Sequence, residues 1–367
     1  MRKGARIDTT LALLTAALLV SGLFIFSSAA FGFLARGASN ISSIVFNHLV
    51  LGLGLGLVFL GIGCFVEYRI WRKYAPHLFV FALIVTALVF VPHIGMEHGG
   101  GRRWISLAHV TFQPSEGLKL ATIVVAAAYF ASIKNRILSA QYGIAGFFAI
   151  MAGPVLLLFA QPDLGTLGVI ALSILAIFFA AGARMRDIAL IACLAIIALG
   201  ALVLLKPYVR DRVMTFFDPS VGQQAESYQI RQSLIAIGSG GITGRGFGQG
   251  VQKFTYLPEP MGDSIFAVAG EELGFVGSVF LIGLYLAFAL RGFAIAARAH
   301  DPFGSNLAIG ISTYLASEAF INIAAMLGVA PLTGIPLTFV SQGGSAMLVS
   351  LASAGILLNV SRYRVKK

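Results

Sequence analysis

The sequence predicts an all-α, polytopic membrane protein with about ten transmembrane helices and one long extracytoplasmic loop. Hydrophobic residues make up 58% of the chain and charged residues only 11%, whereas a soluble domain carries about 25% charged residues. The mean hydropathy is +0.89, and the apolar residues fall in long runs separated by short polar segments. We therefore expect a single membrane domain over residues 1–367.

Ten apolar runs are long enough to cross a bilayer, which takes about 20 helical residues. The expected spans are residues 10–34, 44–66, 75–92, 114–133, 142–160, 164–182, 188–205, 264–290, 304–328 and 343–361. The two cysteines, Cys64 and Cys193, lie inside such runs, and we expect them to act as small hydrophobic residues.

The distribution of Lys and Arg predicts the orientation of these spans. With the N-terminus in the cytoplasm, 16 of the 26 Lys and Arg residues fall on the cytoplasmic side and nine on the outer side, while Lys119 lies within a span. This asymmetry favours cytoplasmic positions for both termini. The net charge of +11 does not indicate nucleic-acid binding, because the basic residues punctuate the apolar runs instead of clustering.

The outer side holds the two long polar segments, 93–113 and 206–263. The second contains apolar pieces that predict short helices on or in the membrane surface, and a loop this long in a compact protein is usually functional. Five arginines on these segments suit a phosphate ligand, Arg102, Arg103, Arg210, Arg212 and Arg245, and Trp104 suits a membrane interface. We expect the arginines to lie close enough to Asp263, at the end of the second segment, to keep its carboxylate ionised. Arginine forms bidentate contacts with phosphate, so a pyrophosphate-linked lipid is one expected ligand. Lipid headgroups are the alternative, with the tryptophan as an interfacial anchor.

Charged residues at the starts of two spans predict buried polar contacts. Glu116 and Lys119 are three residues apart and share a helix face, so they form either a structural ion pair or the wall of a polar cavity. Asp163 is placed to cap the sixth span, and capping alone would explain it. A carboxylate in the middle of a span costs roughly 2.5–3.5 kcal/mol. We therefore expect Glu318 to face the interior of the bundle, either paired or protonated.

The segment 256–263 is the expected site of chemistry. Its two prolines and one glycine interrupt the backbone, and Asp263 stands at the mouth of the eighth span, shortly after Glu259. Acidic residues at a membrane boundary are costly and usually functional. Glu271 and Glu272, two turns into the span, are the competing carboxylates.

A second interruption, 331–345, is rich in proline, glycine and hydroxyl side chains and includes Ser341. Its composition predicts a bent, non-helical segment that re-enters the bundle. Such backbone is tolerated at membrane depth only where it lies against protein or lines a cavity.

Several motifs resemble those of the SEDS proteins, the shape, elongation, division and sporulation polymerases that include FtsW and RodA. The matching stretches are Gly101-x-Arg103-Trp104-Ile105, Phe112-Gln113-Pro114-Ser115-Glu116-x-x-Lys119, Gln161-Pro162-Asp163-Leu164-Gly165-Thr166, Gln232-Ser233-x-Ile235-Ala236-Ile237-Gly238-Ser239-Gly240-Gly241 and Gly334-Ile335-Pro336-Leu337-x-Phe339-Val340-Ser341-x-Gly343-Gly344-Ser345. They cover nearly the whole chain in order. The stretches 252–259 and 270–274 look more like the FtsW branch, whereas 334–336 is closer to RodA.

The resemblance implies an inverting glycosyltransferase that polymerises lipid II into peptidoglycan on the outer face of the bacterial cytoplasmic membrane during cell division. It makes Asp263 the match of the family's catalytic aspartate in a Pro-Glu-x-His-Thr-Asp motif. This sequence departs from that motif, because Met261 and Gly262 replace the histidine and the threonine. The substrate-binding residues expected with it are Arg103, Trp104, Glu116, Lys119, Asp163, Arg210, Arg245, Glu259 and Ser341.

The resemblance also bears on cofactors and partners. It assigns no specific cofactor, and a divalent cation, Mg²⁺ or Mn²⁺, is the candidate metal. The expected partners are a class B penicillin-binding protein with transpeptidase activity and other membrane proteins of the division machinery. The alternatives are a RodA-like elongation polymerase, a lipid II flippase that does not need Asp263 as a base, and a non-catalytic scaffold for a transpeptidase.

Overall fold

The computed structural model describes residues 7–35, 41–98, 101–107, 110–217 and 224–363, and each of the ten expected spans coincides with a helix there. The long helices are α1 (Thr9–Ala35), α3 (Leu55–Phe65), α4 (Tyr68–Ala87), α5 (Pro114–Ser132), α6 (Ile144–Ala160), α7 (Leu164–Ala180), α8 (Met185–Leu205), α12 (Ile265–Ala296), α13 (Pro302–Met326) and α14 (Gly344–Arg362). A short helix, α2 (Ile41–Phe46), and a π-helical stretch, η1 (Asn47–Gly54), lead into α3. The single-turn 3₁₀ helices are η2 (Leu88–Phe90) and η3 (Lys134–Arg136).

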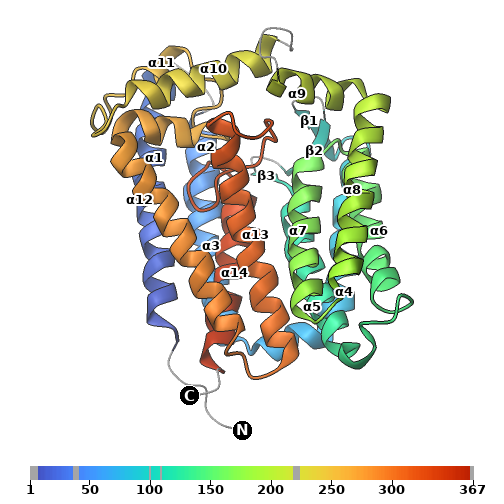
Figure 1. Ribbon diagram of the computed structural model, residues 1–367. Helices are drawn as coiled ribbons and strands as arrows, with labels where there is room; N and C mark the ends of the chain where they lie inside the picture. The colour runs from blue at the N-terminus through green and yellow to red at the C-terminus, as the bar shows by residue number, and fades with distance from the viewer. Residues whose placement is uncertain (1–6, 36–40, 99–100, 108–109, 218–223, 364–367) are drawn as a thin grey trace.

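The long helices stand side by side as a bundle, and three further helices lie across one end of it (Figure 1). These are α9 (Pro207–Phe217), α10 (Gln224–Ser239) and α11 (Gln252–Thr255), which confirm the helices expected within the long loop. We call the end that they cover the distal end. The first and last described helices meet at the opposite end, where the backbone N–H of Asp8 donates to Ser361 Oγ at 3.0 Å.

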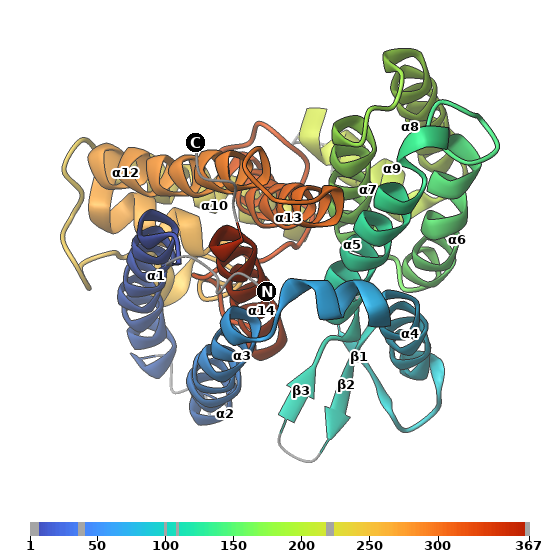
Figure 2. The ribbon, with the colours of Figure 1, turned by 90° about the horizontal axis from the view of Figure 1, so that it is seen from below.

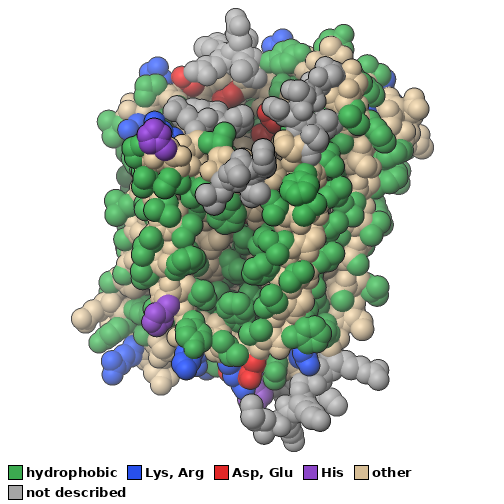
Figure 3. Space-filling view, turned by 180° about the vertical axis from the view of Figure 1, so that it is seen from behind, with side chains coloured by type: hydrophobic (Ala, Val, Ile, Leu, Met, Phe, Trp, Pro, Cys, Tyr) green, Lys and Arg blue, Asp and Glu red, His purple; other side chains and the backbone are tan. Residues whose placement is uncertain are grey.

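The bundle has an apolar exterior suited to lipid. Within the described residues, seven helices are long and apolar enough to cross a membrane. Helices α6 and α7 are shorter apolar helices, and α5 carries the charged pair at its start. Hydrophobic side chains cover the middle of the face in Figure 3, and charged side chains gather toward its two ends. Burial is uneven, because 83% of the most apolar window of α14 is buried against 6% for α8. Helix α14 therefore forms the core, and α8 lies at the periphery (Figure 2).

The segment 93–113 departs from the all-α expectation. It forms a three-stranded antiparallel sheet of β1 (Gly95–His98), β2 (Gly101–Leu107) and β3 (Val110–Phe112). Trp104 of β2 pairs with Met96 of β1, next to a bulge. The strands are short and their pairing depends on which residues meet across the turns, so the hydropathy pattern did not reveal them. The third span is also longer than expected, because α4 begins at Tyr68 and continues through Pro76.

Glycines bring α3 and α14 into close contact. A Cβ added at Gly355 would lie 2.3 Å from the carbonyl oxygen of Leu60, and one added at Gly63 would lie 2.9 Å from the backbone of Gly355. Small residues at helix interfaces in membranes allow this backbone approach, from which van der Waals contacts stabilise the pair. The glycines of the second span therefore serve the packing of the core.

We expect Gly355→Ala to destabilise the protein, because the added methyl group overlaps a backbone carbonyl that cannot move freely. Overpacking of this kind typically costs about 1–3 kcal/mol. The matched control is Gly61→Ala in α3, since nothing lies within 4 Å of a Cβ at Gly61. Thermal unfolding in detergent should show a lower midpoint for Gly355→Ala alone. Equal midpoints for the two variants would contradict the close packing.

Candidate active site

Asp263 lies in the turn that opens α12 at the distal end. The prolines of the sequence Pro258-Glu259-Pro260 prevent an earlier helix start, and Glu259 adopts a positive φ of 43° that reverses the chain. Asp263 itself is only partly exposed. Its Oδ1 accepts a hydrogen bond from Gln229 Nε2 of α10 at 3.0 Å. The carboxylate therefore sits between the bundle and the helices that cover its end.

The backbone of this turn is held from below by the segment between α13 and α14. Asn322 Nδ2 donates to the carbonyl oxygens of Asp263 and Ile335, both at 2.8 Å. Ser341 Oγ donates to the carbonyl oxygen of Gly262 at 2.6 Å, and the N–H of Gln342 donates to that of Met261 at 2.7 Å. The non-helical segment expected over 331–345 is therefore present, and it positions the Asp263 turn through backbone contacts.

The electrostatic surroundings of Asp263 differ from those expected. We expected arginines close enough to favour its charged form. Instead, burial, together with the nearby Glu259 carboxylate, raises the pKa of Asp263 to about 6. The hydrogen bond from Gln229 acts in the opposite direction. The carboxylate is thus mostly ionised at neutral pH, with a pKa close to the range in which a group can both accept and release a proton.

Below this turn, Lys119 connects two helices through buried charges. Its Nζ lies 2.8 Å from Glu116 Oε2 and is also paired with Glu318 of α13. Glu318 Oε2 in turn accepts from Thr338 Oγ1 at 3.2 Å. Glu318 thus faces the interior and is paired, which is one of the two states expected for it, and the three residues form one network. The network reaches the non-helical segment at Thr338.

Arg103 of β2 contacts the loop before α7. Its Nε donates to the carbonyl oxygen of Gln161 at 3.1 Å, and its Nη2 donates to that of Pro162. Asp163 caps α7 by accepting from the N–H of Thr166 at 3.2 Å, as expected. Arg103 and Asp163 both act electrostatically on Tyr208 of α9, whose pKa is raised mainly by burial. These side chains therefore gather under α9, and Arg103 keeps guanidinium donors beyond the two that it uses here.

Glu271 and Glu272 are occupied by structural contacts. Glu271 Oε1 accepts from the N–H of Val251 at 2.8 Å, and Glu272 accepts from the N–H groups of Gly248 and Gly250 at 3.1 and 3.3 Å. Glu272 also pairs with the buried Lys253. Both carboxylates thus bind the backbone of the glycine-rich loop before α11, residues 244–251. These contacts give the loop a structural role that needs no phosphate ligand.

The remaining expected site residues are spread over the distal end. Arg245 Nε lies 3.7 Å from Glu271 Oε1, and the arginine side chain remains exposed. Arg210 is exposed on α9, and Trp104 is half-buried on β2. No group of three or more metal-ligating side chains occurs in the described ranges. Glu259 is the acid that acts electrostatically on Asp263.

Sequence reasoning missed Gln229, which the structure places against Asp263. The residues are 34 positions apart, and only the folding of the long loop back over the bundle brings them together. The sequence did contain an indication of this contact. Gln229 directly precedes Ile230 and Ser233, which begin a stripe of buried residues at helical spacing along α10. A polar residue at the edge of a buried stripe indicates a contact with the protein.

The fold and this site define a polytopic membrane protein in which buried charges and a non-helical segment position one partly exposed carboxylate. A family model described as "Cell cycle protein", for FtsW, RodA and SpoVE, matches residues 9–366. The chain therefore belongs to the FtsW/RodA/SpoVE family, and the resemblance to SEDS proteins is confirmed.

Relatives and solved structures agree with this assignment. Stage V sporulation protein E of Bacillus subtilis is 36% identical over 356 residues, which is 97% of each chain. The probable peptidoglycan glycosyltransferase FtsW of Geobacter sulfurreducens is 38% identical over 317 residues, covering 86% of this chain and 83% of the relative.

Among solved structures, a chain of a peptidoglycan synthase complex that coordinates polymerization and crosslinking matches with a TM-score of 0.79 and 29% identity. The match covers 98% of this chain and 99% of the chain in the complex. The rod shape determining protein RodA of Thermus thermophilus matches with a TM-score of 0.70 and 27% identity, covering 98% of each chain.

We expect Lys119→Met to destabilise the bundle strongly. The substitution keeps the length of the side chain but leaves Glu116 and Glu318 buried without a cation. Removing one partner of a buried ion pair typically costs about 3–5 kcal/mol. Thermal unfolding in detergent measures the loss, and adding Glu318→Gln to Lys119→Met should recover part of it. A single variant as stable as the wild type would show that the network does not stabilise the fold.

Proposed function

We propose that this protein is an inverting peptidoglycan glycosyltransferase that joins lipid II units, with Asp263 as its general base. The observation that carries the proposal is the division of roles among the acidic residues at the distal end. Glu271 and Glu272 are held by backbone N–H groups and Lys253, whereas Asp263 is partly exposed and has a raised pKa. The family relatives named as probable peptidoglycan glycosyltransferases support the reaction.

The reaction follows from this placement of Asp263. The carboxylate takes the proton from a sugar hydroxyl of the acceptor as the hydroxyl oxygen attacks the anomeric carbon of the donor. The bond between that carbon and the lipid pyrophosphate breaks, and the pyrophosphate leaves with the bonding electron pair. Attack from the opposite side inverts the configuration at the anomeric carbon. The proton on Asp263 is then released to solvent, which a pKa near 6 permits at neutral pH.

The charge on the leaving pyrophosphate requires cations on the distal face. Arg103 and Arg210 are the candidates on β2 and α9, and Arg245 contributes less because Glu271 neutralises part of its charge. Arginine suits this role because its planar guanidinium group binds phosphate through two parallel hydrogen bonds. A divalent cation, Mg²⁺ or Mn²⁺, would supply further positive charge.

The proposal also covers the membrane orientation and the protein partners of the enzyme. The distal end faces the outside of the bacterial cytoplasmic membrane, and both termini are cytoplasmic. The positive-inside asymmetry supports this orientation. A class B penicillin-binding protein is the proposed partner, and the similarity to a chain of a synthase complex that couples polymerization to crosslinking supports it. The FtsW relatives favour a role in cell division, with other division proteins as further partners.

Asp263→Asn should abolish most polymerisation while leaving the fold intact. The amide keeps the size and the hydrogen-bonding reach of the carboxylate but cannot take up the proton. General-base assistance is typically worth ~10²–10⁴-fold in rate, so we expect at least a hundredfold loss. Purified protein with fluorescent lipid II provides the assay, and the length of the glycan product is read on a gel.

Two further variants complete this test. Asp263→Glu should retain little activity, because its longer arm misplaces the oxygen. Glu271→Gln should lower stability more than it lowers the rate of the folded protein. Normal polymerisation by Asp263→Asn would reject the proposed base and favour a flippase or a scaffold.

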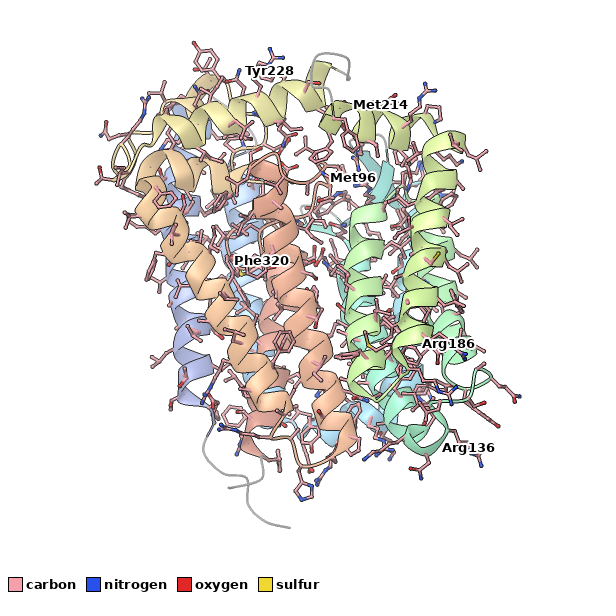
Figure 4. All side chains as sticks on the ribbon, in the orientation of Figure 1. Met96, Arg136, Arg186, Met214, Tyr228 and Phe320 are labelled. Atoms are coloured by element: carbon pink, nitrogen blue, oxygen red, sulfur yellow. The ribbon has the colours of Figure 1, made fainter. Side chains whose placement is uncertain are left out.

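Single cysteines at the two ends of the bundle test the orientation in a background that lacks Cys64 and Cys193. Tyr228 of α10 is exposed at the distal end, and Arg136 is exposed at the opposite end (Figure 4). Tyr228→Cys should react with an impermeant maleimide in intact cells, and Arg136→Cys only after lysis. The reverse pattern would invert the proposed topology.

A further inference from the structure

The side-chain amide of Gln229 makes two contacts with the turn that opens α12. Its Nε2 donates to Asp263 Oδ1 at 3.0 Å and to Ser264 Oγ at 2.9 Å. An amide nitrogen has two protons, so both of its donors are used on this one turn. The nitrogen therefore faces the carboxylate in a fixed direction instead of sampling several rotamers.

The position of Gln229 is fixed by the packing of α10. Ile230, Ser233 and Ala236, which follow at helical spacing, are buried. Ser233 Oγ contacts Met326 Sδ of α13 at 3.5 Å. Directly after α10, a Cβ added at Gly240 would lie 2.1 Å from the carbonyl oxygen of Gly270. The backbone at the end of α10 is therefore in close contact with the backbone of α12. A helix anchored in this way can hold a side chain against Asp263.

The backbone N–H groups of Asp263 and Ser264 also favour the charged form of the carboxylate, but the other side chains around Asp263 do not. Asn322 of α13 and Ser341 of the non-helical segment bind backbone carbonyl oxygens of the turn and leave the carboxylate alone. Glu259, on the same turn, is the charged side chain that acts on Asp263, and it disfavours the ionised form. Gln229 is the side-chain donor that opposes both this repulsion and the burial of the carboxylate.

We propose that Gln229 is a positioning residue that orients the Asp263 carboxylate and keeps it in the ionised form needed to accept a proton. The inference rests on the proposed function of Asp263 and adds a second residue to it. An amide N–H binds an ionised oxygen more strongly than a protonated carboxyl group. Gln229 therefore links the covering helix α10 to the protonation state of the base.

The first test is the pH dependence of polymerisation by the full-length protein. The wild-type rate should fall below a midpoint near pH 6, the pKa of Asp263. Gln229→Leu keeps the bulk but removes the donors, and a hydrogen bond to a charged group lost from a partly exposed site should raise the midpoint by about one pH unit. The rate at pH 6.5 would then fall about threefold, because the ionised fraction drops from roughly three quarters to one quarter. KM for lipid II should stay unchanged.

Two further variants, a second substitution of Gln229 and a control at Gln232, test the origin of this shift in midpoint. Gln229→Glu keeps the shape but places a further carboxylate against Asp263, so its midpoint should lie above that of Gln229→Leu. Gln232→Ala is the matched control, since Gln232 lies one turn away on the same helix and is half-buried. This control should keep the wild-type midpoint. A loss of rate by the same factor at every pH, with the midpoint unchanged in both Gln229 variants, would overturn the proposal.

A second readout does not depend on catalysis. A water-soluble carbodiimide modifies protonated carboxyl groups, and mass spectrometry of the peptide that contains Asp263 gives the midpoint of its protonation. The midpoint should rise in Gln229→Leu and Gln229→Glu and stay constant in Gln232→Ala. Unchanged labelling would overturn the role of Gln229 even if Asp263→Asn is inactive. Normal polymerisation by Asp263→Asn would instead reject the base while leaving the labelling test valid.

Discussion

The ion network of Lys119 with Glu116 and Glu318 is the interaction on which the rest of the structure depends. A buried charge in a membrane bundle is costly unless it is paired, so these side chains require α5 and α13 to approach in one register. Thr338 extends the network to the segment between α13 and α14 through its bond to Glu318. The same network therefore joins two helices and anchors the non-helical segment between α13 and α14.

That anchored stretch explains how a non-helical backbone persists inside the bundle. Several of its carbonyl and amide groups bond to side chains of α12 and α13 or to each other, as when Tyr285 donates to the carbonyl oxygen of Thr338. The satisfied segment then contacts the turn before α12 through Ser341 and Gln342. Asp263 is thus supported from below by the bundle and contacted from above by Gln229, which leaves a partly exposed carboxylate in a rigid frame.

Much of this architecture was predictable because it depends on local sequence. The ten spans follow from runs of apolar residues, the cap of Asp163 follows from its place before α7, and the interruption around Ser341 follows from prolines and glycines. The sheet over 93–113 was missed because its strands are short and their pairing is not local. The environment of Asp263 was wrongly predicted, since counting arginines on one side of the membrane does not show which of them faces the carboxylate. Arg245 illustrates this point, because Glu271 partly neutralises it.

The sequence by itself determined where the long apolar helices lie along the chain and which acid stands at the mouth of α12. Helical hydrogen bonding and hydropathy act over a few residues, so they can be read along the chain. The tertiary structure alone decided that Lys119 also pairs with Glu318, that Glu272 pairs with Lys253 in the segment before α12, and that Gln229 faces Asp263. These three pairings join residues from 19 to 199 positions apart. They form because side chains from separate helices must satisfy one another's charge and hydrogen-bonding needs where water is excluded.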